Sequence, residues 1–306
     1  MKVLRTPAER FVNLPGYNFS PNYAFVAAGD GSSDKLRVHY VDEGSAAATD
    51  TIVMLHGEPT WSYIYRDLIP LLVHAGHRCI APDLVGFGRS DKPANRSDYT
   101  YERHIGWVRE LLFEQLGLGS VTLLLHDWGG LIGLRLVAEQ PERFSRVIAA
   151  NTGLPTGGQL VSKEFSSWLQ FSQRDVSFDI GKIVQSGCVN MLDVEVLAAY
   201  DAPFPSEAFK QGARAFPALV PISECDVSSE ANRRAWESLA SFERPFLCAF
   251  SDLDPLTKGA ERSLQRIIPG CADRPHVLIR GAGHFLQEDC SEELARSVNS
   301  FIAQTV

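Results

Sequence analysis

The most constraining feature of the sequence is an abrupt change from a strand pattern to a helix pattern within residues 121–137. An apolar, β-prone run ends at His126, and an apolar helical pattern begins directly after the glycine pair at positions 129 and 130. Glycines at such a corner allow a sharp strand-to-helix turn, and the side chain at its tip stands exposed at the end of the strand. That side chain is Asp127. The stretch therefore predicts a carboxylate that is presented for nucleophilic chemistry.

Apolar strand-like runs alternate with amphipathic helical patterns along most of the chain. This rhythm predicts a mostly parallel, doubly wound sheet, and with the corner at Asp127 it indicates the α/β-hydrolase fold. The run 36–42 alternates apolar and polar residues, which is typical of an antiparallel strand at a sheet margin. The expected strands are 23–28, 36–42, 51–56, 77–82, 121–126, 147–150, 245–251 and 276–280. The expected helices are 62–74, 101–116, 258–268 and 291–303, and one that directly follows the corner.

The rhythm is interrupted between residues 154 and 229. This stretch has helical fragments, five prolines and several aromatic residues, but no clear strand pattern. We therefore expect a helical cap, inserted after the sixth strand, over the carboxyl ends of the strands, where open α/β sheets bind their ligands. The expected division is a first part of the main domain over 1–154, a cap over 155–228 and a second part of the main domain over 229–306.

Charge and composition exclude several classes of function. The formal net charge of −8, without a basic cluster, argues against a nucleic-acid partner. No apolar run approaches the length of a membrane span, and the N-terminus lacks the apolar segment of a signal peptide, so we expect a cytoplasmic protein. The six cysteines form no C-x-x-C pair and have no histidine at a metal-like spacing. We therefore expect no metal and no cofactor. The oligomeric state is not determined by the sequence, and we expect a monomer.

Two further motifs supply partners for Asp127. In this fold the acid and then the histidine follow the nucleophile along the chain. His284 lies in a loop directly after an expected strand and is the candidate base. Two carboxylates compete to orient it, Asp252 and Asp254. We favour Asp254, although it is equally placed to cap the helix that follows. Asn151, after the preceding strand, is disfavoured because an amide cannot balance the charge of an imidazolium.

An oxyanion hole requires two backbone N–H groups beside the nucleophile. We expect one from Trp128, the residue after Asp127, and the other from Glu58, in the loop after the strand 51–56. Only the backbone of Glu58 serves this purpose. Its carboxylate must be paired or solvated, and Arg66 and Arg135 are the candidate partners.

The residue types around the corner indicate which bond is attacked. A carboxylate is suited to displacing a leaving group from saturated carbon, which produces an alkyl ester on the enzyme. Water activated by His284 then hydrolyses that ester. The indole of Trp128 offers an N–H donor on an apolar frame, which is suited to a departing anion. Trp168 is the candidate for a second donor, or it packs as core between Phe165 and Phe171.

These residues together resemble the haloalkane dehalogenases of the α/β-hydrolase superfamily. The resemblance implies Asp127 as nucleophile, Asp254 as acid, His284 as base, and Trp128 with Trp168 as halide donors. It matches the branch of the family that has Glu in the HGEP loop and a tryptophan pair at the halide site. The matching segments are HGEPTWSY at 56–63, APDLVGFGRSDKP at 81–93, HDWGG at 126–130, AYDAPFP at 199–205 and AGHFLQE at 282–288. The substrate pocket is expected to contain Phe165, Phe171, Phe216, Pro217, Val220 and Phe285.

The expected activity is hydrolysis of a small halogenated alkane by water to an alcohol, a halide and a proton, without a cofactor. An epoxide hydrolase of the same fold is the alternative, because that class also uses an aspartate nucleophile. It requires two cap tyrosines to protonate the epoxide oxygen, and the expected cap has one, Tyr200. A non-catalytic binding protein of this fold would be expected to have a broken triad, whereas this sequence has every member.

Overall fold

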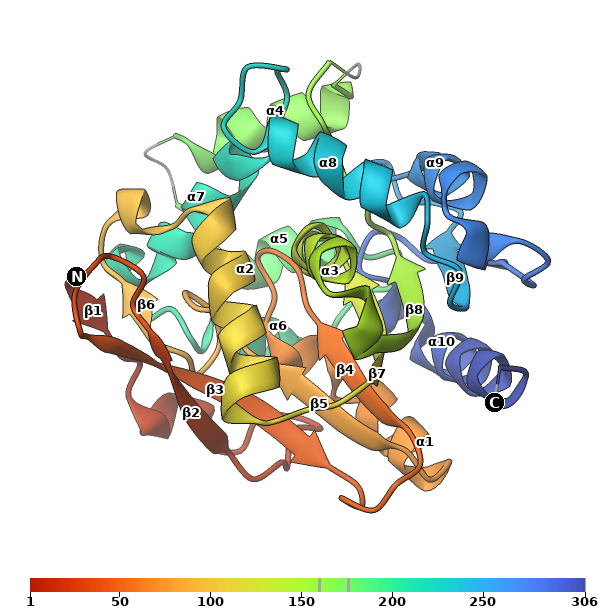
Figure 1. Cartoon of the computed structure of the whole chain (residues 1–306). Helices are drawn as coiled ribbons and strands as arrows, with labels where there is room; N and C mark the ends of the chain where they lie inside the picture. The colour runs from red at the N-terminus through yellow and green to blue at the C-terminus, as the bar shows by residue number, and fades with distance from the viewer. Residues whose placement is uncertain (159–160, 175–176, 306) are drawn as a thin grey trace.

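The computed structural model describes residues 1–158, 161–174 and 177–305 (Figure 1). Its centre is an eight-stranded sheet in the order β10-β9-β8-β7-β4-β5-β3-β2. The strands from β10 to β5 are parallel, whereas β3 and β2 run antiparallel at one margin. The strands are β2 (Asn22–Ala27), β3 (Lys35–Glu43), β4 (Thr51–Leu55), β5 (Arg78–Pro82), β7 (Val121–His126), β8 (Phe144–Ala150), β9 (Phe246–Ser251) and β10 (Val277–Ile279). A separate short ribbon joins β1 (Val3–Leu4) to β6 (Lys92–Pro93).

The burial of the strands follows their sequence patterns. Every residue of β7 and β9 is buried, as their continuous apolar runs require for strands with both faces covered. The edge strand β2 alternates between less and more exposed residues. One face of the sheet is covered by α2, α3 and α8, and α1 packs against α10 on the other (Figure 1). These helices are α1 (Leu68–His74), α2 (Tyr101–Arg109), α3 (Trp128–Glu139), α8 (Ser229–Leu239) and α10 (Leu286–Ala303).

The corner between β7 and α3 depends on close contact with a neighbouring strand. Asp127 has a φ of 49°, in the left-handed region, and helix α3 begins at the next residue. A Cβ atom at Gly129 would lie 2.0 Å from the carbonyl oxygen of Leu55 in β4. Only glycine therefore allows the first turn of α3 to pack this tightly against the sheet.

The described residues between β8 and β9 form helices and no strands. In chain order these helices are α4 (Lys163–Ser172), α5 (Ile180–Ser186), α6 (Val194–Asp201), η6 (Glu207–Lys210), α7 (Gln211–Leu219) and α8. Helix α8 begins at Ser229 and packs against α3. The division into main domain and cap at 154/155 and 228/229 stays a prediction. None of the helices described here is both long enough and apolar enough to cross a membrane.

Three expected helices differ in detail from those observed. The helix expected over 62–74 is split into the 3₁₀ turn η2 (Ser62–Tyr65) and α1. Helix α2 continues as the π-helix η4 (Glu110–Gln115). Helix α10 starts at Leu286, but Cys290 has non-helical backbone angles, so the predicted start at residue 291 marks only its second part. The remaining elements are η1 (Ala8–Phe11), η3 (Arg96–Asp98), η5 (Pro141–Arg143), α9 (Ala260–Ile267) and η7 (Pro269–Cys271).

Candidate active site

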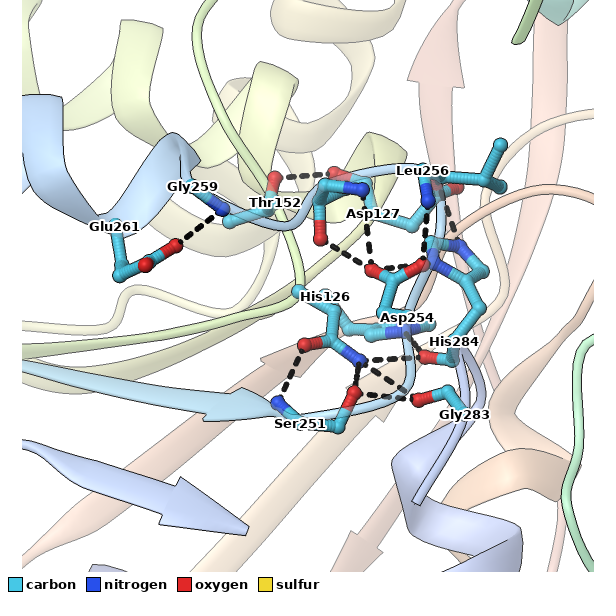
Figure 2. Close-up of polar contacts among 12 residues, drawn as sticks. His126, Asp127, Thr152, Ser251, Asp254, Leu256, Gly259, Glu261, Gly283 and His284 are labelled. Carbon is cyan, nitrogen blue, oxygen red and sulfur yellow. Dashed lines mark hydrogen bonds and ion pairs between the residues drawn. The ribbon is translucent and has the colours of Figure 1, made fainter. Parts of the chain in front are cut away.

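The carboxylate of Asp127 is held from two sides. Its Oδ1 accepts a hydrogen bond from the backbone N–H of Glu58 at 2.7 Å. Its Oδ2 lies 3.4 Å from Nε2 of His284. The hydroxyl of Thr152 donates to the backbone carbonyl of Asp127 at 2.7 Å and fixes the corner itself (Figure 2). One carboxylate oxygen thus faces a backbone donor, and the other faces the imidazole.

The structure places Asp254, not Asp252, beside His284. Oδ2 of Asp254 is 3.1 Å from Nδ1 of the imidazole (Figure 2). Asp254 also accepts hydrogen bonds from the backbone N–H of Leu256, at 2.9 Å, and from the hydroxyl of Thr257. Asp252 instead accepts a hydrogen bond from the N–H of Gly281 at 2.8 Å. Helix α9 has Gly259 at its N-cap position, so Asp254 does not cap it.

The three ionisable groups shift one another's pKa values. Burial disfavours the imidazolium of His284, but the charges and hydrogen bonds of Asp254 and Asp127 outweigh it and raise its pKa to about 10. Burial also works against the charged form of Asp254, but the charge of His284 holds the pKa of that carboxyl well below its usual range. For Asp127, the hydrogen bond with His284 overcomes burial and lowers the pKa. The resting site therefore contains an imidazolium between two carboxylates at neutral pH.

Glu58 is the odd group in this site. Its side chain is buried, and its Oε1 has no hydrogen-bond partner among the described residues. Burial, reinforced by the charge of Asp127, raises its pKa well above the ordinary value and so favours the uncharged acid. The expectation that Arg66 or Arg135 pairs with it is wrong. Arg66 binds Glu288 and Arg135 binds Glu102 and Glu139.

His126, Asn151 and Ser251 connect the loops of the site through hydrogen bonds. The sequence did not indicate these residues as functional. The Nε2 of His126 lies 2.8 Å from the carbonyl oxygen of His284. The amide of Asn151 donates to the same carbonyl at 2.9 Å and to the hydroxyl of Ser251 at 2.8 Å. The positions of Asn151 and Ser251 at the ends of β8 and β9 are the only sequence signal for this network. That signal does not distinguish them from other strand-end residues.

A cavity of about 700 Å³ opens above Asp127. Its charged and ionisable lining groups are Glu58, Asp127, Lys258 and His284, and the walls are predominantly apolar. This size and character suit a small organic molecule. No cluster of three or more metal-ligating side chains occurs within the described ranges. The apolar lining includes Trp128, Leu131, Leu154, Phe165, Trp168, Ile183, Pro217, Val220, Pro221, Trp236, Leu256 and Phe285.

Comparison with known proteins agrees with this geometry. Residues 50–290 match the family model of the alpha/beta hydrolase fold. The haloalkane dehalogenase of Psychrobacter cryohalolentis is 54% identical over 302 residues, which cover 99% of this chain and 98% of that protein. The haloalkane dehalogenase of Mycobacterium marinum is 48% identical, and the match covers 98% of this chain and the whole of that protein. This chain belongs to the haloalkane dehalogenase family.

A solved structure gives the same result. The tetrameric haloalkane dehalogenase DpaA from Paraglaciecola agarilytica superposes with a TM-score of 0.87. It is 36% identical, and the match covers 97% of each chain. The expected α/β-hydrolase fold, with its mostly parallel sheet, is thereby confirmed.

Two of the residues expected in the substrate pocket of this haloalkane dehalogenase family member do not line the cavity. Phe165, Pro217, Val220 and Phe285 line the cavity. The placement of Phe171 and Phe216 in the lining was wrong. Phe171 stacks on Phe178, and its ring lies tilted against that of Trp168. Phe216 is buried behind the wall, between Trp128, Phe87 and His104. Helical spacing does not reveal which face of a cap helix meets the cavity.

The five tryptophans of this member of the haloalkane dehalogenase family differ in the surroundings of their indole N–H groups. The indole N–H groups of Trp107 and Trp236 donate to backbone carbonyl oxygens, and that of Trp61 is buried without a partner in the described part of the chain. Trp128 and Trp168 line the cavity, and neither indole N–H donates to another described residue. Trp168 also stacks on Phe178, with ring centroids 5.6 Å apart. It therefore both packs against the core and faces the cavity.

Proposed function

We propose that this protein hydrolyses carbon–halogen bonds of haloalkanes through an ester formed on Asp127. One observation carries the proposal: a carboxylate replaces the usual alcohol nucleophile and faces an apolar cavity with two unengaged indole N–H groups. A carboxylate attacks saturated carbon, and an anion that leaves into an apolar cavity requires donors there. Membership of the haloalkane dehalogenase family supports the same reaction.

In the first step, Oδ2 of Asp127 attacks the carbon that bears the halogen. A carbon–oxygen bond forms, and the halide leaves with the bonding electron pair. Trp128 and Trp168 donate their indole N–H groups to the halide. Indole is a donor without an acceptor, so it solvates an anion without acting as a base.

In the second step, water attacks Cγ of the ester while Nε2 of His284 accepts its proton. The negative charge moves onto Oδ1, where the backbone N–H groups of Glu58 and Trp128 stabilise it. The tetrahedral intermediate then collapses, and the alkoxide leaves as the alcohol with the proton from His284. The second proton of the water passes from the Asp127 carboxyl group to His284, which restores the carboxylate and the imidazolium. The sum is haloalkane plus water to alcohol, halide and a proton.

The raised pKa of His284 links the two steps. Formation of the ester removes the negative charge of Asp127, which is one of the charges that favour the imidazolium. The pKa of His284 therefore falls once the ester exists, and the imidazole loses its proton and becomes a base. Burial raises the pKa of Glu58, which disfavours a second negative charge in the cavity beside Asp127.

The epoxide reaction has less support. It requires tyrosine hydroxyl groups in the cavity, and no tyrosine of the described chain lines it. Tyr200 is buried, and its hydroxyl donates to Glu288 in α10. That hydroxyl is therefore already engaged away from the cavity.

The cap, the halide-site branch, the monomeric state and the cytoplasmic location stay predictions. We assign residues 155–228 to the cap, which closes the cavity over Asp127 and supplies Trp168. The relative from Paraglaciecola agarilytica is a tetramer, so light scattering during size-exclusion chromatography is the measurement that decides the state of this chain.

The test is a comparison of two substrates. The protein is incubated with 1-bromobutane and, separately, with styrene oxide, and bromide and diol are followed. We expect bromide release by the unaltered protein and none by Asp127→Asn. Formation of diol without release of bromide would identify the protein as an epoxide hydrolase instead. The role of Trp168 is tested by chloride binding, followed through quenching of tryptophan fluorescence. Trp168→Phe should bind chloride more weakly, and an unchanged chloride affinity would exclude Trp168 from the halide site.

A further inference from the structure

Asn151 occupies a central place in the active-site loops. It follows the last residue of β8, and its side chain is fully buried. Its Nδ2 lies 2.9 Å from the carbonyl oxygen of His284, 3.0 Å from that of Gly283 and 2.8 Å from Oγ of Ser251. Its Oδ1 accepts a hydrogen bond from the backbone N–H of Ser251 at 2.9 Å. One amide thereby joins the loops that carry His284 and Asp254.

The same residue also contacts the nucleophile. The backbone N–H of Asp127 donates to the carbonyl oxygen of Asn151 at 3.2 Å. Asn151 therefore binds the main chain of the nucleophile with its carbonyl group and the main chain of the base with its amide. His126 strengthens the second contact, because its Nε2 lies 2.8 Å from the carbonyl oxygen of His284.

We propose that Asn151 is a positioning residue, which sets the separation of Asp127 and His284 for hydrolysis of the ester. The inference rests on the proposed function. Nε2 of His284 and Oδ2 of Asp127 are 3.4 Å apart before reaction. In the second step a water must reach both Cγ of Asp127 and that nitrogen. Small errors in such a geometry slow a reaction strongly.

The chemistry of the position explains why the residue is an asparagine. Two carbonyl oxygens and a hydroxyl surround Nδ2, and only a side chain with N–H groups satisfies them. A carboxylate there would face the two carbonyl oxygens without a proton to donate. The backbone φ of Asn151 is 40°, a left-handed conformation that asparagine tolerates better than most residues.

The positioning role predicts an effect on one step only. Attack by Asp127 on the haloalkane breaks the carbon–halogen bond without help from His284. Attack by water forms a carbon–oxygen bond to Cγ and transfers a proton to Nε2, so it depends on where His284 lies. Loss of the Asn151 amide should therefore slow decay of the ester and leave its formation nearly unchanged.

The experiment uses Asn151→Gly, which deletes the amide but readily adopts the left-handed backbone. Asn151→Asp is the second variant, because it retains the size of the side chain should the glycine variant fold poorly. After rapid mixing of the full-length protein with 1-bromobutane, acid quenching and mass spectrometry follow formation and decay of the alkyl ester. Asn232→Ala is the matched control, since it removes another buried amide that binds Arg135 and the Pro155 carbonyl.

We expect ester decay to slow on the order of 10- to 100-fold in Asn151→Gly and Asn151→Asp. Ester formation should stay within about threefold of the unaltered protein, and the control should change neither rate beyond that range. Equal slowing of both steps, or decay as fast as in the control, would overturn the positioning role. Absence of any ester in the unaltered protein and in His284→Gln would instead count against the proposed function.

Discussion

At the scale of single residues, Glu58 is a buried carboxyl group without a cationic partner among the described residues. Its ordinary pKa is 4.5, and burial raises it well above that value in the folded protein. Below the pKa of the unfolded chain, both states hold this proton and the raised pKa costs no stability. As the pH rises above that value, the unfolded chain ionises first, so the free energy of unfolding falls. Glu58→Gln should therefore be more stable than the unaltered protein at pH 8 and equally stable at pH 4. Thermal unfolding at both pH values tests this, and equal differences at the two values would contradict it.

The imidazole of His284 gives a second prediction at this scale. Its pKa of about 10 depends on Asp254 and Asp127, which oppose burial. Its ion pairs therefore stabilise the fold below pH 6.5, and this contribution is lost as the pH rises toward 10. Asp127→Asn removes one of the two charges, so the NMR titration midpoint of His284 should fall. The half-buried His276 is the internal control, and an unchanged midpoint for His284 would refute the electrostatic coupling.

Candidate triad residues were predictable from the sequence because chain order and strand ends restrict them. Asp127 stands at a glycine-rich corner, and His284 occupies the third place in the expected order. The raised pKa of Glu58 was not predictable, because it depends on which arginines reach the carboxyl group. Arg66 is close to Glu58 in the sequence and Arg135 lies in α3, yet both form ion pairs with other carboxylates. Pairing among side chains of distant segments is invisible to motif spacing.

At the scale of elements, a buried ion pair joins Arg66, directly after η2, to α10, and a hydrogen bond from α6 reaches the same carboxylate. The guanidinium of Arg66 contacts both carboxylate oxygens of Glu288, and the Tyr200 hydroxyl donates to the same carboxylate. The side chains of Arg66 and Glu288 are 7% and 2% exposed. A charge left unpaired at such a site is far more costly than a lost neutral hydrogen bond. The connection between the helical segment and α10 therefore depends chiefly on Glu288.

This contact predicts a ranking of two substitutions. Glu288→Gln should lower the free energy of unfolding by about 3–5 kcal/mol, since it leaves Arg66 buried without its main partner. Tyr200→Phe should cost about 1–2 kcal/mol, because the ion pair remains. Denaturant unfolding measures both. The exposed pair of Asp179 and Lys182 serves as control, with a cost for Asp179→Asn of about 1 kcal/mol or less. A reversed order would contradict the assignment.

Element boundaries show where local sequence is a poor guide. The corner from β7 to α3 was predicted at the correct residues, because Gly129 must pack against the Leu55 carbonyl. The start of α10 was not, because the kink at Cys290 interrupts its periodicity. Phe171 and Phe216 show the same difficulty in the helical segment. Helical fragments were expected in this segment, but the face that each helix presents depends on its neighbours in three dimensions.

At the scale of the whole molecule, the order of strands brings the separate motifs together. Strands β7, β8 and β9 are adjacent and parallel, so the loops after them meet at one edge of the sheet. Those loops carry Asp127, Asn151 and Asp254, and the loop after β10 adds His284. This convergence was predictable from the alternation of strands and helices. The size of the cavity was not, because it depends on how the helices between β8 and β9 pack.

In the proposed reaction Asp127 becomes covalently alkylated, and His284 is needed only to release the product. The most direct measurement is intact-mass and peptide-mass spectrometry of His284→Gln after reaction with 1-bromobutane. We expect the protein to gain the mass of one butyl group, located on the peptide that contains Asp127, with release of one bromide per chain. Continued bromide release without an adduct, or an adduct on another residue, would contradict the claim.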